Sequence, residues 1–337
     1  MRRLRSLAVL TAVLLAGNST LSAALPDFST LTGSISTLAD KAGAALPSAS
    51  ALGLDWSDSW IGSLVGVPPH FGLGLSAGFT TIPTGSLQPI FDAMGQQLPT
   101  YATALGGVPL PMYTINGRVG GFLLPFDIGF KLGYMPTLTV SNMGVDYLLA
   151  GADLRYALLQ DGITPGLSVG FGVNYIQADV SYTFPDRSFN VPNFTSSNGA
   201  TGVTLKSPTA SLGLKDLTYE LKAEISKNLL IVTPYAGAAL DLSEMRAEAG
   251  FNGTILGTDG TTTSTLTPGD LASLNSLTGA NFTSNGVSYT ALSNNIWGAR
   301  IYGGFSFNIV FFKIDVKALY SFPSGNLGAD IGARFQM

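Results

Sequence analysis

The chain has 337 residues, of which 46% are hydrophobic and only 11% are charged. An average soluble domain is about 25% charged, so much of this protein's surface is not expected to meet water. With no cysteine and one histidine, the sequence excludes disulfides and thiolate metal sites and argues against a histidine metal centre, so no cofactor and no metal site is predicted.

The first predicted element is a secretory signal peptide over residues 1–24. Three arginines within the first five residues precede an apolar run over 7–16 and a small-residue cleavage site at 22–24. The run is too short for the ~20 residues of a spanning helix, which disfavours an uncleaved anchor. Cleavage removes three of 17 basic residues and leaves 21 acidic ones, a net charge near −7 that argues against nucleic acid as a partner.

Residues 25–69 form a separate N-terminal element rich in Ala, Ser, Leu and Gly. A helix is expected over 28–46, with Asp27 or Ser29 as its cap. Two tryptophans then precede the Pro68-Pro69 pair. The element is either a partly helical plug inside a larger domain or a periplasmic element, and the remaining residues, 70–337, form the second domain.

From residue 71 apolar and polar residues alternate with a period of two, which predicts strands. Most of these segments approach the ~9–11 residues of a transmembrane strand. About ten are expected, with 8–14 possible because 184–214 and 243–294 could hide further strands or extend their neighbours. They cover 71–79, 113–123, 126–134, 148–156, 167–175, 217–225, 236–242, 299–309, 312–320 and 327–335.

The charged residues of these strands fall in the register opposite the apolar ones. A soluble β-sandwich would show the same alternation, so the pattern alone does not separate a sandwich from a membrane barrel. The residues in the charged register are Arg118, Asp127, Lys131, Asp153, Arg155, Glu220, Lys222, Glu224, Arg300, Lys313, Asp315, Lys317, Asp330 and Arg334.

Export, loop lengths and aromatic positions favour a barrel. Short connections at 124–125, 159–164, 226–229 and 308–310 alternate with longer ones at 80–112, 135–144, 184–214 and 243–294; only 321–326 is a short connection on the second side. Outer-membrane barrels combine short periplasmic turns with long external loops and two aromatic girdles. The candidate girdles are Phe79, Tyr113, Tyr134, Tyr147, Tyr175 and Tyr320 at one end, and Phe71, Phe126, Tyr156, Phe312 and Phe335 at the other.

Over about 71–337 the chain resembles bacterial outer-membrane β-barrel proteins. The closing stretch Leu327–Phe335 is similar to their C-terminal assembly signal, although Gln336 and Met337 follow the aromatic residue that usually ends the chain. The glycine-rich strands also resemble spirochaete barrels. The resemblance implies an all-β fold, a transmembrane antiparallel up-and-down barrel in the outer membrane of a diderm bacterium. Its implied partners are membrane lipid and, through the last strand, the barrel-assembly machinery.

The fourteen charges of the strands are candidates to line the lumen. They could form a selective pore or an internal network that fills a narrow barrel. Eight are basic and six acidic, and this balance favours mutual pairing over ion selectivity.

The leading functional prediction is a passive channel or transporter for small or apolar solutes. An N-terminal element ahead of the first strand is similar in layout to long-chain fatty-acid transporters with a hatch. In that case Phe28, Leu54, Trp56 and Trp60 would contact an apolar solute, unless they only pack the plug.

The alternative function is a structural or adhesin-like barrel that binds host or matrix components through its external loops. Phe184, Phe189, Phe194 and Phe251 are its candidate contacts. An enzyme is not predicted, because the single histidine, His70, follows Pro69 at a strand start rather than lying in a recognisable triad. The ligand and the oligomeric state are left open.

Overall fold

The computed structural model describes residues 23–24, 28–61, 70–83, 85, 87–98, 100–121, 124–140, 142–283, 286–322 and 324–337. Side chains are not described at 23–24, 28–32, 101, 140 and 287–296. The predicted signal peptide therefore lies outside the described residues except for Ala23–Ala24.

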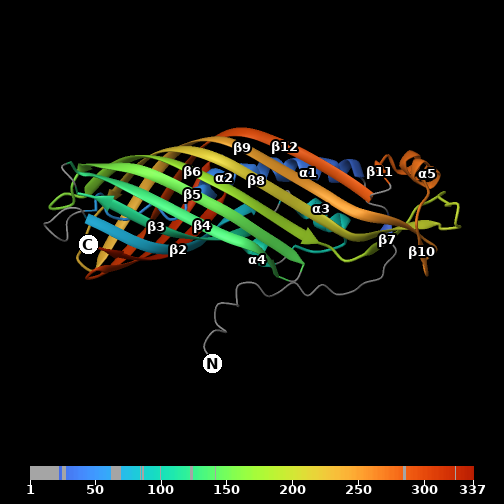
Figure 1. Cartoon of the computed structure of the whole chain (residues 1–337), viewed down its shortest axis with the longest axis horizontal. Helices are drawn as coiled ribbons and strands as arrows, with labels where there is room; N and C mark the ends of the chain where they lie inside the picture. The colour runs from blue at the N-terminus through green and yellow to red at the C-terminus, as the bar shows by residue number, and fades with distance from the viewer. Residues whose placement is uncertain are drawn as a thin grey trace, which may run out of the picture.

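Ten long strands form a closed antiparallel ring (Figure 1). Each pairs with the next along the chain, and the last pairs back to the first. The predicted strand number and up-and-down order are confirmed. The strands are β2 (His70–Pro83), β3 (Gly107–Gly120), β4 (Phe126–Val140), β5 (Met143–Leu159), β6 (Gly166–Thr183), β8 (Gly202–Ser226), β9 (Val232–Thr258), β12 (Gly286–Ile309), β13 (Phe312–Phe322) and β14 (Leu327–Gln336).

The burial of the ring is inverted relative to a soluble protein. Apolar side chains point outward and stay exposed, as at Leu73 (61%) and Leu75 (62%), whereas the charged side chains of the opposite register are buried. A backbone that crosses hydrocarbon must satisfy its own hydrogen bonds, which a closed sheet does without leaving an edge. The apolar outer face and the closed ring together make this a transmembrane β-barrel.

No helix among the described residues is long and apolar enough to cross a bilayer.

Three neighbouring strands, β8, β9 and β12, run far beyond the others toward one end of the molecule (Figure 1). β9 alone has 27 residues, whereas a spanning strand needs about 9–11. The predicted loops over 184–214 and 243–294 are therefore partly strand extensions and partly further short strands, the two readings that the sequence left open. Shorter elements surround the extension: β7 (Arg187–Asn190), β10 (Thr263–Ser264), α5 (Pro268–Thr278) and β11 (Phe282–Thr283).

This end is the external one, because the short turns 124–125, 160–165, 227–231 and 310–311 lie at the opposite end. The β2–β3 connection on the external side carries α3 (Gln88–Ala93) and α4 (Thr100–Ala104). One predicted external loop, 135–144, is wrong: β4 and β5 continue pairing out to Val140 and Met143 and leave only a tight hairpin.

The N-terminal element is helical in its first part. α1 (Phe28–Gly43) contacts β9, β12 and α3, and α2 (Leu46–Ser50) contacts β5, β6 and β8. Residues 51–61 follow without regular structure. We call residues 28–61 the inner segment, because its contacts reach strands from around the ring.

Tyr147 is a correction to the predicted girdles. It is 2% exposed, and its hydroxyl donates a hydrogen bond to the carbonyl oxygen of Tyr113. Leu148 next to it faces outward, so strict alternation places Tyr147 inside the barrel.

Candidate functional site: the ion-pair layer of the lumen

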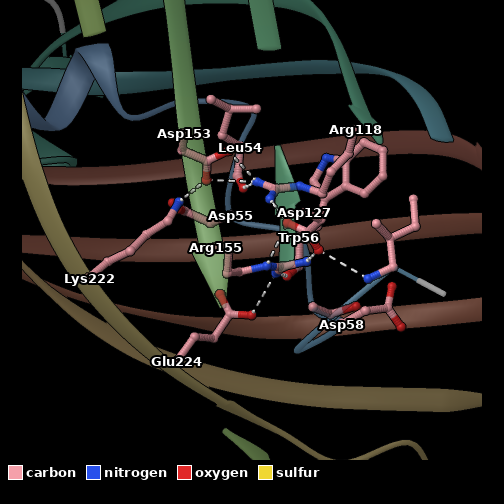
Figure 2. A network of polar contacts seen from close by, with 12 residues as sticks. Leu54, Asp55, Trp56, Asp58, Arg118, Asp127, Asp153, Arg155, Lys222 and Glu224 are labelled. Carbon is pink, nitrogen blue, oxygen red and sulfur yellow. Dashed lines mark hydrogen bonds and ion pairs between the residues drawn. The ribbon is translucent and has the colours of Figure 1, made fainter. Parts of the chain in front are cut away.

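The fourteen charged residues predicted for the lumen are all buried. In the periplasmic half of the barrel they meet residues 50–61 of the inner segment, and together these groups make the ion-pair layer (Figure 2). Because period two places every second side chain of a strand on one face, ten closed strands bring these charges into a single interior.

Two carboxylates of the inner segment hold four cations of the wall. Asp55 pairs with Lys222 of β8 at 3.0 Å and with Lys317 of β13 at 2.7 Å. Asp58 pairs with Lys313 at 2.6 Å and Arg334 at 2.9 Å. Each aspartate thus joins two different strands, so the inner segment is bound to the wall on more than one side.

Backbone carbonyl groups of the inner segment accept further hydrogen bonds from the wall. Arg118 donates to Leu54 at 2.8 Å, Arg155 donates to Trp56 at 2.8 Å, and Lys131 donates to Ser50. These bonds satisfy an irregular backbone that has no ladder of its own, which a buried segment requires.

Trp56 is enclosed by cationic and polar groups. Its indole nitrogen donates to Asn116 at 3.2 Å, and the guanidinium of Arg334 lies 4.6 Å from its ring centroid. Arg118 approaches the same ring at 5.7 Å. A guanidinium over an indole face is a favourable contact in a desolvated site. The ring of Trp56 therefore packs against the arginines of the ion-pair layer.

The wall residues also pair with one another. Arg118 bridges Asp127 and Asp153, Arg155 bridges Asp127 and Glu224, and Arg300 bridges Glu220 and Asp241. Lys222 also contacts Asp153 and Glu220, Lys317 contacts Asp330, and Arg334 contacts Asp315. These contacts favour the predicted alternative of an internal network over a selectivity filter.

Two buried acidic wall residues escaped sequence analysis. Asp241 pairs with Arg300 at 2.7 Å, and Asp216 accepts hydrogen bonds from Ser243 and Thr218. Asp241 lies in the charged register of the predicted segment 236–242. Asp216 lies one residue before the predicted strand 217–225. The alternation already turns Asp241 into the barrel, and extending the predicted strand 217–225 by one residue would have added Asp216.

The charges of the two inner-segment aspartates depend on their partners. Burial alone raises the pKa of Asp55, but the ammonium groups of Lys317 and Lys222 outweigh burial and hold that pKa well below its usual value of 3.8. Burial likewise raises the pKa of Asp58, and Lys313 with Arg334 outweighs it to bring the pKa to about 2. Both carboxylates are therefore charged at neutral pH.

The external half of the lumen is apolar. Ile35, Leu38 and Leu46 of the inner segment belong to one buried cluster with residues of the wall and of α3. Phe184, Phe189, Phe194 and Phe251 lie in the same cluster and are at most 3% exposed. Their prediction as surface contacts is wrong, because Phe251 points inward from β9 and the other three rings pack into the same buried cluster.

The remaining predicted contacts have ordinary surroundings. Leu54 is buried, at 3% exposed. The ring of Trp60 lies edge-on to that of His70, with 6.3 Å between the ring centroids. The side chain of Phe28 lies outside the described residues. The described residues hold no group of three or more histidine, cysteine or acidic side chains placed to bind a metal ion. The ion pairs and hydrogen bonds of the site hold the inner segment inside the ring of strands.

Known proteins give three kinds of comparison. The Lsa36-like family matches residues 100–337. No curated protein sequence matches the chain. Among solved structures, the translocator domain of the autotransporter NalP from Neisseria meningitidis is similar, with 13% identity, a TM-score of 0.33, and coverage of 93% of this chain and 99% of that one.

Two further structures are similar at the same level. The outer membrane protease OmpT from Escherichia coli has 11% identity and a TM-score of 0.33, over 80% of this chain and 96% of that one. The P. putida toluene transporter TodX has 8% identity and a TM-score of 0.28, over 80% and 91%.

The family match runs from α4 to the C-terminus and includes nine of the ten strands of the ring. It agrees with the resemblance to spirochaete barrels expected from the sequence. The closed ring, the apolar outer face and the long external loops are those of an outer-membrane protein, as predicted. The chain belongs to the Lsa36-like family and is an outer-membrane β-barrel.

Proposed function

We propose that the protein acts at the cell surface as a closed barrel that binds a partner through its external extension. The observation that carries this proposal is the filled lumen. The inner segment and the wall bury each other through the ion-pair layer and the apolar cluster. With the lumen occupied, the projecting strands are the part of the molecule that meets the surroundings.

The tip of the extension is a structured surface, which we call the external cap (residues 187–201 and 259–283). Asp270, in the first turn of α5, forms a capping box with the N-cap residue Thr267 and also accepts hydrogen bonds from the backbone and hydroxyl of Ser197, at 2.7 and 2.9 Å. At the other end of α5, the side-chain amide of Asn275 donates to the carbonyl oxygen of Phe282 and accepts from its backbone amide. Loops held this firmly present their side chains in fixed positions, as binding loops on a rigid scaffold do.

The exposed residues of the cap are mostly uncharged. They include Asn193, Asn198, Thr261, Ser273 and Leu277, the last 48% exposed. Hydroxyl and amide groups recognise a partner by hydrogen bonding rather than by long-range charge. We therefore expect binding to host or matrix glycoproteins with little dependence on salt concentration.

The test compares cells that display the intact protein with cells whose residues 259–283 are replaced by a short Gly-Ser linker. Adhesion to a surface coated with extracellular-matrix glycoproteins is measured at low and high salt. The proposal predicts adhesion that the replacement abolishes and salt leaves nearly unchanged. Equal adhesion by both proteins, with equal surface expression, would remove the cap from the function.

Gated transport is the second candidate, and one observation favours it. Residues 50–61 of the inner segment are held to the wall largely by ion pairs and carbonyl contacts, and α1 is held by apolar packing, so release of the segment would break no part of the ring. Transport of small or apolar solutes would then need this segment to move.

A disulfide latch tests that requirement in a chain without native cysteine. A Cβ at Gly43 would lie 3.4 Å from the Cβ of Ala247, near the usual disulfide separation of about 3.8 Å. The Gly43→Cys, Ala247→Cys protein should transport solute when reduced and lose transport when oxidised. Uptake indifferent to oxidation would exclude gating by this segment, and Ala247→Cys alone controls for the thiol reagents.

A further inference from the structure

We propose that the inner segment runs through the barrel with its C-terminal end at the periplasmic rim and its N-terminal end outside. The barrel would thus deliver the N-terminal end of its own chain to the cell surface. This goes beyond the proposed binding function, since it assigns the lumen an activity: passage of the protein's own N-terminal segment. Its evidence is the order in which consecutive parts of residues 28–61 meet the wall.

The C-terminal end of the inner segment lies at the periplasmic rim. The backbone amide of Ile61 donates to Asp127 at 3.0 Å. Asp127 is the second residue of β4, directly after the short turn at 124–125. A Cβ at Gly120, the last residue of β3, would lie 2.9 Å from the Ile61 side chain. Residue 61 therefore sits where the barrel wall begins.

The preceding residues lie progressively closer to the outside. Asp55 meets the wall at Lys222 and Lys317, within the spanning part of β8 and β13. A Cβ at Gly53 would meet the Thr114 hydroxyl, and Thr114 is six residues further along β3 toward its external end than Gly120. Residue 53 therefore lies closer to the external end of the barrel than residue 61 does.

The end of α1 lies near the external boundary of the membrane. A Cβ at Gly43 would contact the side chains of Met245 and Ala247. These residues come just after Leu242 in β9, which is still 63% exposed on the apolar outer face and pairs with Trp297.

From Gly43 backward, α1 continues outward. It packs against α3 of the external β2–β3 connection and against β9 and β12. Ten residues of helix cover about 15 Å, which places Gly33 above the membrane boundary. Figure 1 agrees, with α1 in the half of the barrel that leads to α5 and the C-terminus at the opposite end.

Three matched glycine-to-cysteine variants test the threading, because the chain has no other thiol. Gly33 and Gly162 are exposed and have open space where a Cβ would stand, and Gly269 is exposed with only Thr267 nearby at 3.9 Å. Gly162 lies in a periplasmic turn and Gly269 in the external cap. A membrane-impermeant maleimide is applied to intact cells and to cells with a permeabilised outer membrane.

The threading predicts that Gly33→Cys labels on intact cells as Gly269→Cys does, while Gly162→Cys labels only after permeabilisation. Labelling of Gly33→Cys only after permeabilisation, or in neither condition, overturns the proposal. The proposed binding surface is tested separately, because it requires Gly269→Cys to react on intact cells whatever the result for Gly33→Cys. Heat-shifted gel mobility checks that each variant has folded.

Discussion

At the scale of single residues, Asp55 is the centre of the lumen. It is buried, and its two lysine partners come from strands β8 and β13. A buried pair adds little net stability compared with apolar packing, but removal of one partner leaves an uncompensated charge that is costly. The ion-pair layer therefore fixes where the inner segment lies more than it adds to overall stability.

Replacement of Asp55 with asparagine tests this placement. Lys222 keeps Asp153 and Glu220, and Lys317 keeps Asp330, so we expect the low end of the usual range, a loss of about 3 kcal/mol in the free energy of unfolding. Denaturant unfolding in detergent micelles measures it. Asp40→Asn, at an exposed position of α1, is the matched control and should change little. Equal effects of the two substitutions would contradict the role given to Asp55.

Acid should loosen the inner segment in a defined pH range. The pKa of Asp58 is about 2 in the folded protein against a usual 3.8. A lowered pKa stabilises the fold above 3.8, and that contribution is lost as pH falls from 3.8 toward 2.

Acrylamide quenching of tryptophan fluorescence reads this loosening. A Trp297→Phe background leaves only Trp56 and Trp60, both in the inner segment. Quenching should stay constant from pH 7 to about 4 and rise as pH approaches 2. Asp58→Asn should be more strongly quenched already at pH 7. A rise centred near pH 6 would point to a different titrating group.

At the scale of elements, the strands followed from the sequence and the interior did not. Period two sets which face of each strand is apolar, so all ten strands were predictable. The partners of Lys313 and Lys317 were not, because Asp58 and Asp55 lie more than 250 residues away in sequence. Nothing in local alternation marks an aspartate in an irregular segment as the partner of a distant lysine.

The external aromatic residues show a second limit. Phe184, Phe189 and Phe251 lie where the sequence predicts loops, and aromatic residues in loops suggest exposed contacts. The structure buries them because β8 and β9 continue beyond the membrane, and the three rings pack there in one cluster with residues of α1. The length of a strand extension depends on the packing it acquires outside the membrane, which single-strand periodicity does not contain.

The periplasmic turn between β12 and β13 contains local strain. Val310 has φ 53° and is 74% exposed, and the left-handed region costs a residue with a Cβ about 1–2 kcal/mol. Val310→Gly should therefore raise the free energy of unfolding by about 1 kcal/mol. Ile163→Gly, in the turn between β5 and β6, relieves no positive φ and should give no gain. Unfolding in detergent checks both, and destabilisation by Val310→Gly would contradict the assignment of strain.

At the scale of the whole molecule, one barrel has two distinct regions. The ring and its apolar outer face place it in the membrane, and the extension of β8, β9 and β12 carries a structured cap beyond the membrane. The inner segment joins the two regions, since its ends contact the periplasmic rim and the external connections. A closed barrel that presents its cap and its N-terminal end is the simplest account of this arrangement.

Single-channel conductance in planar bilayers tests whether the inner segment closes the barrel. Folded protein, verified by heat-shifted gel mobility, is fused from proteoliposomes at neutral pH, in parallel with a variant lacking residues 28–61. We expect no steady conductance from the full chain and steady conductance from the deletion variant. Steady conductance of the full chain, unchanged by the deletion, would show that the inner segment does not close the barrel.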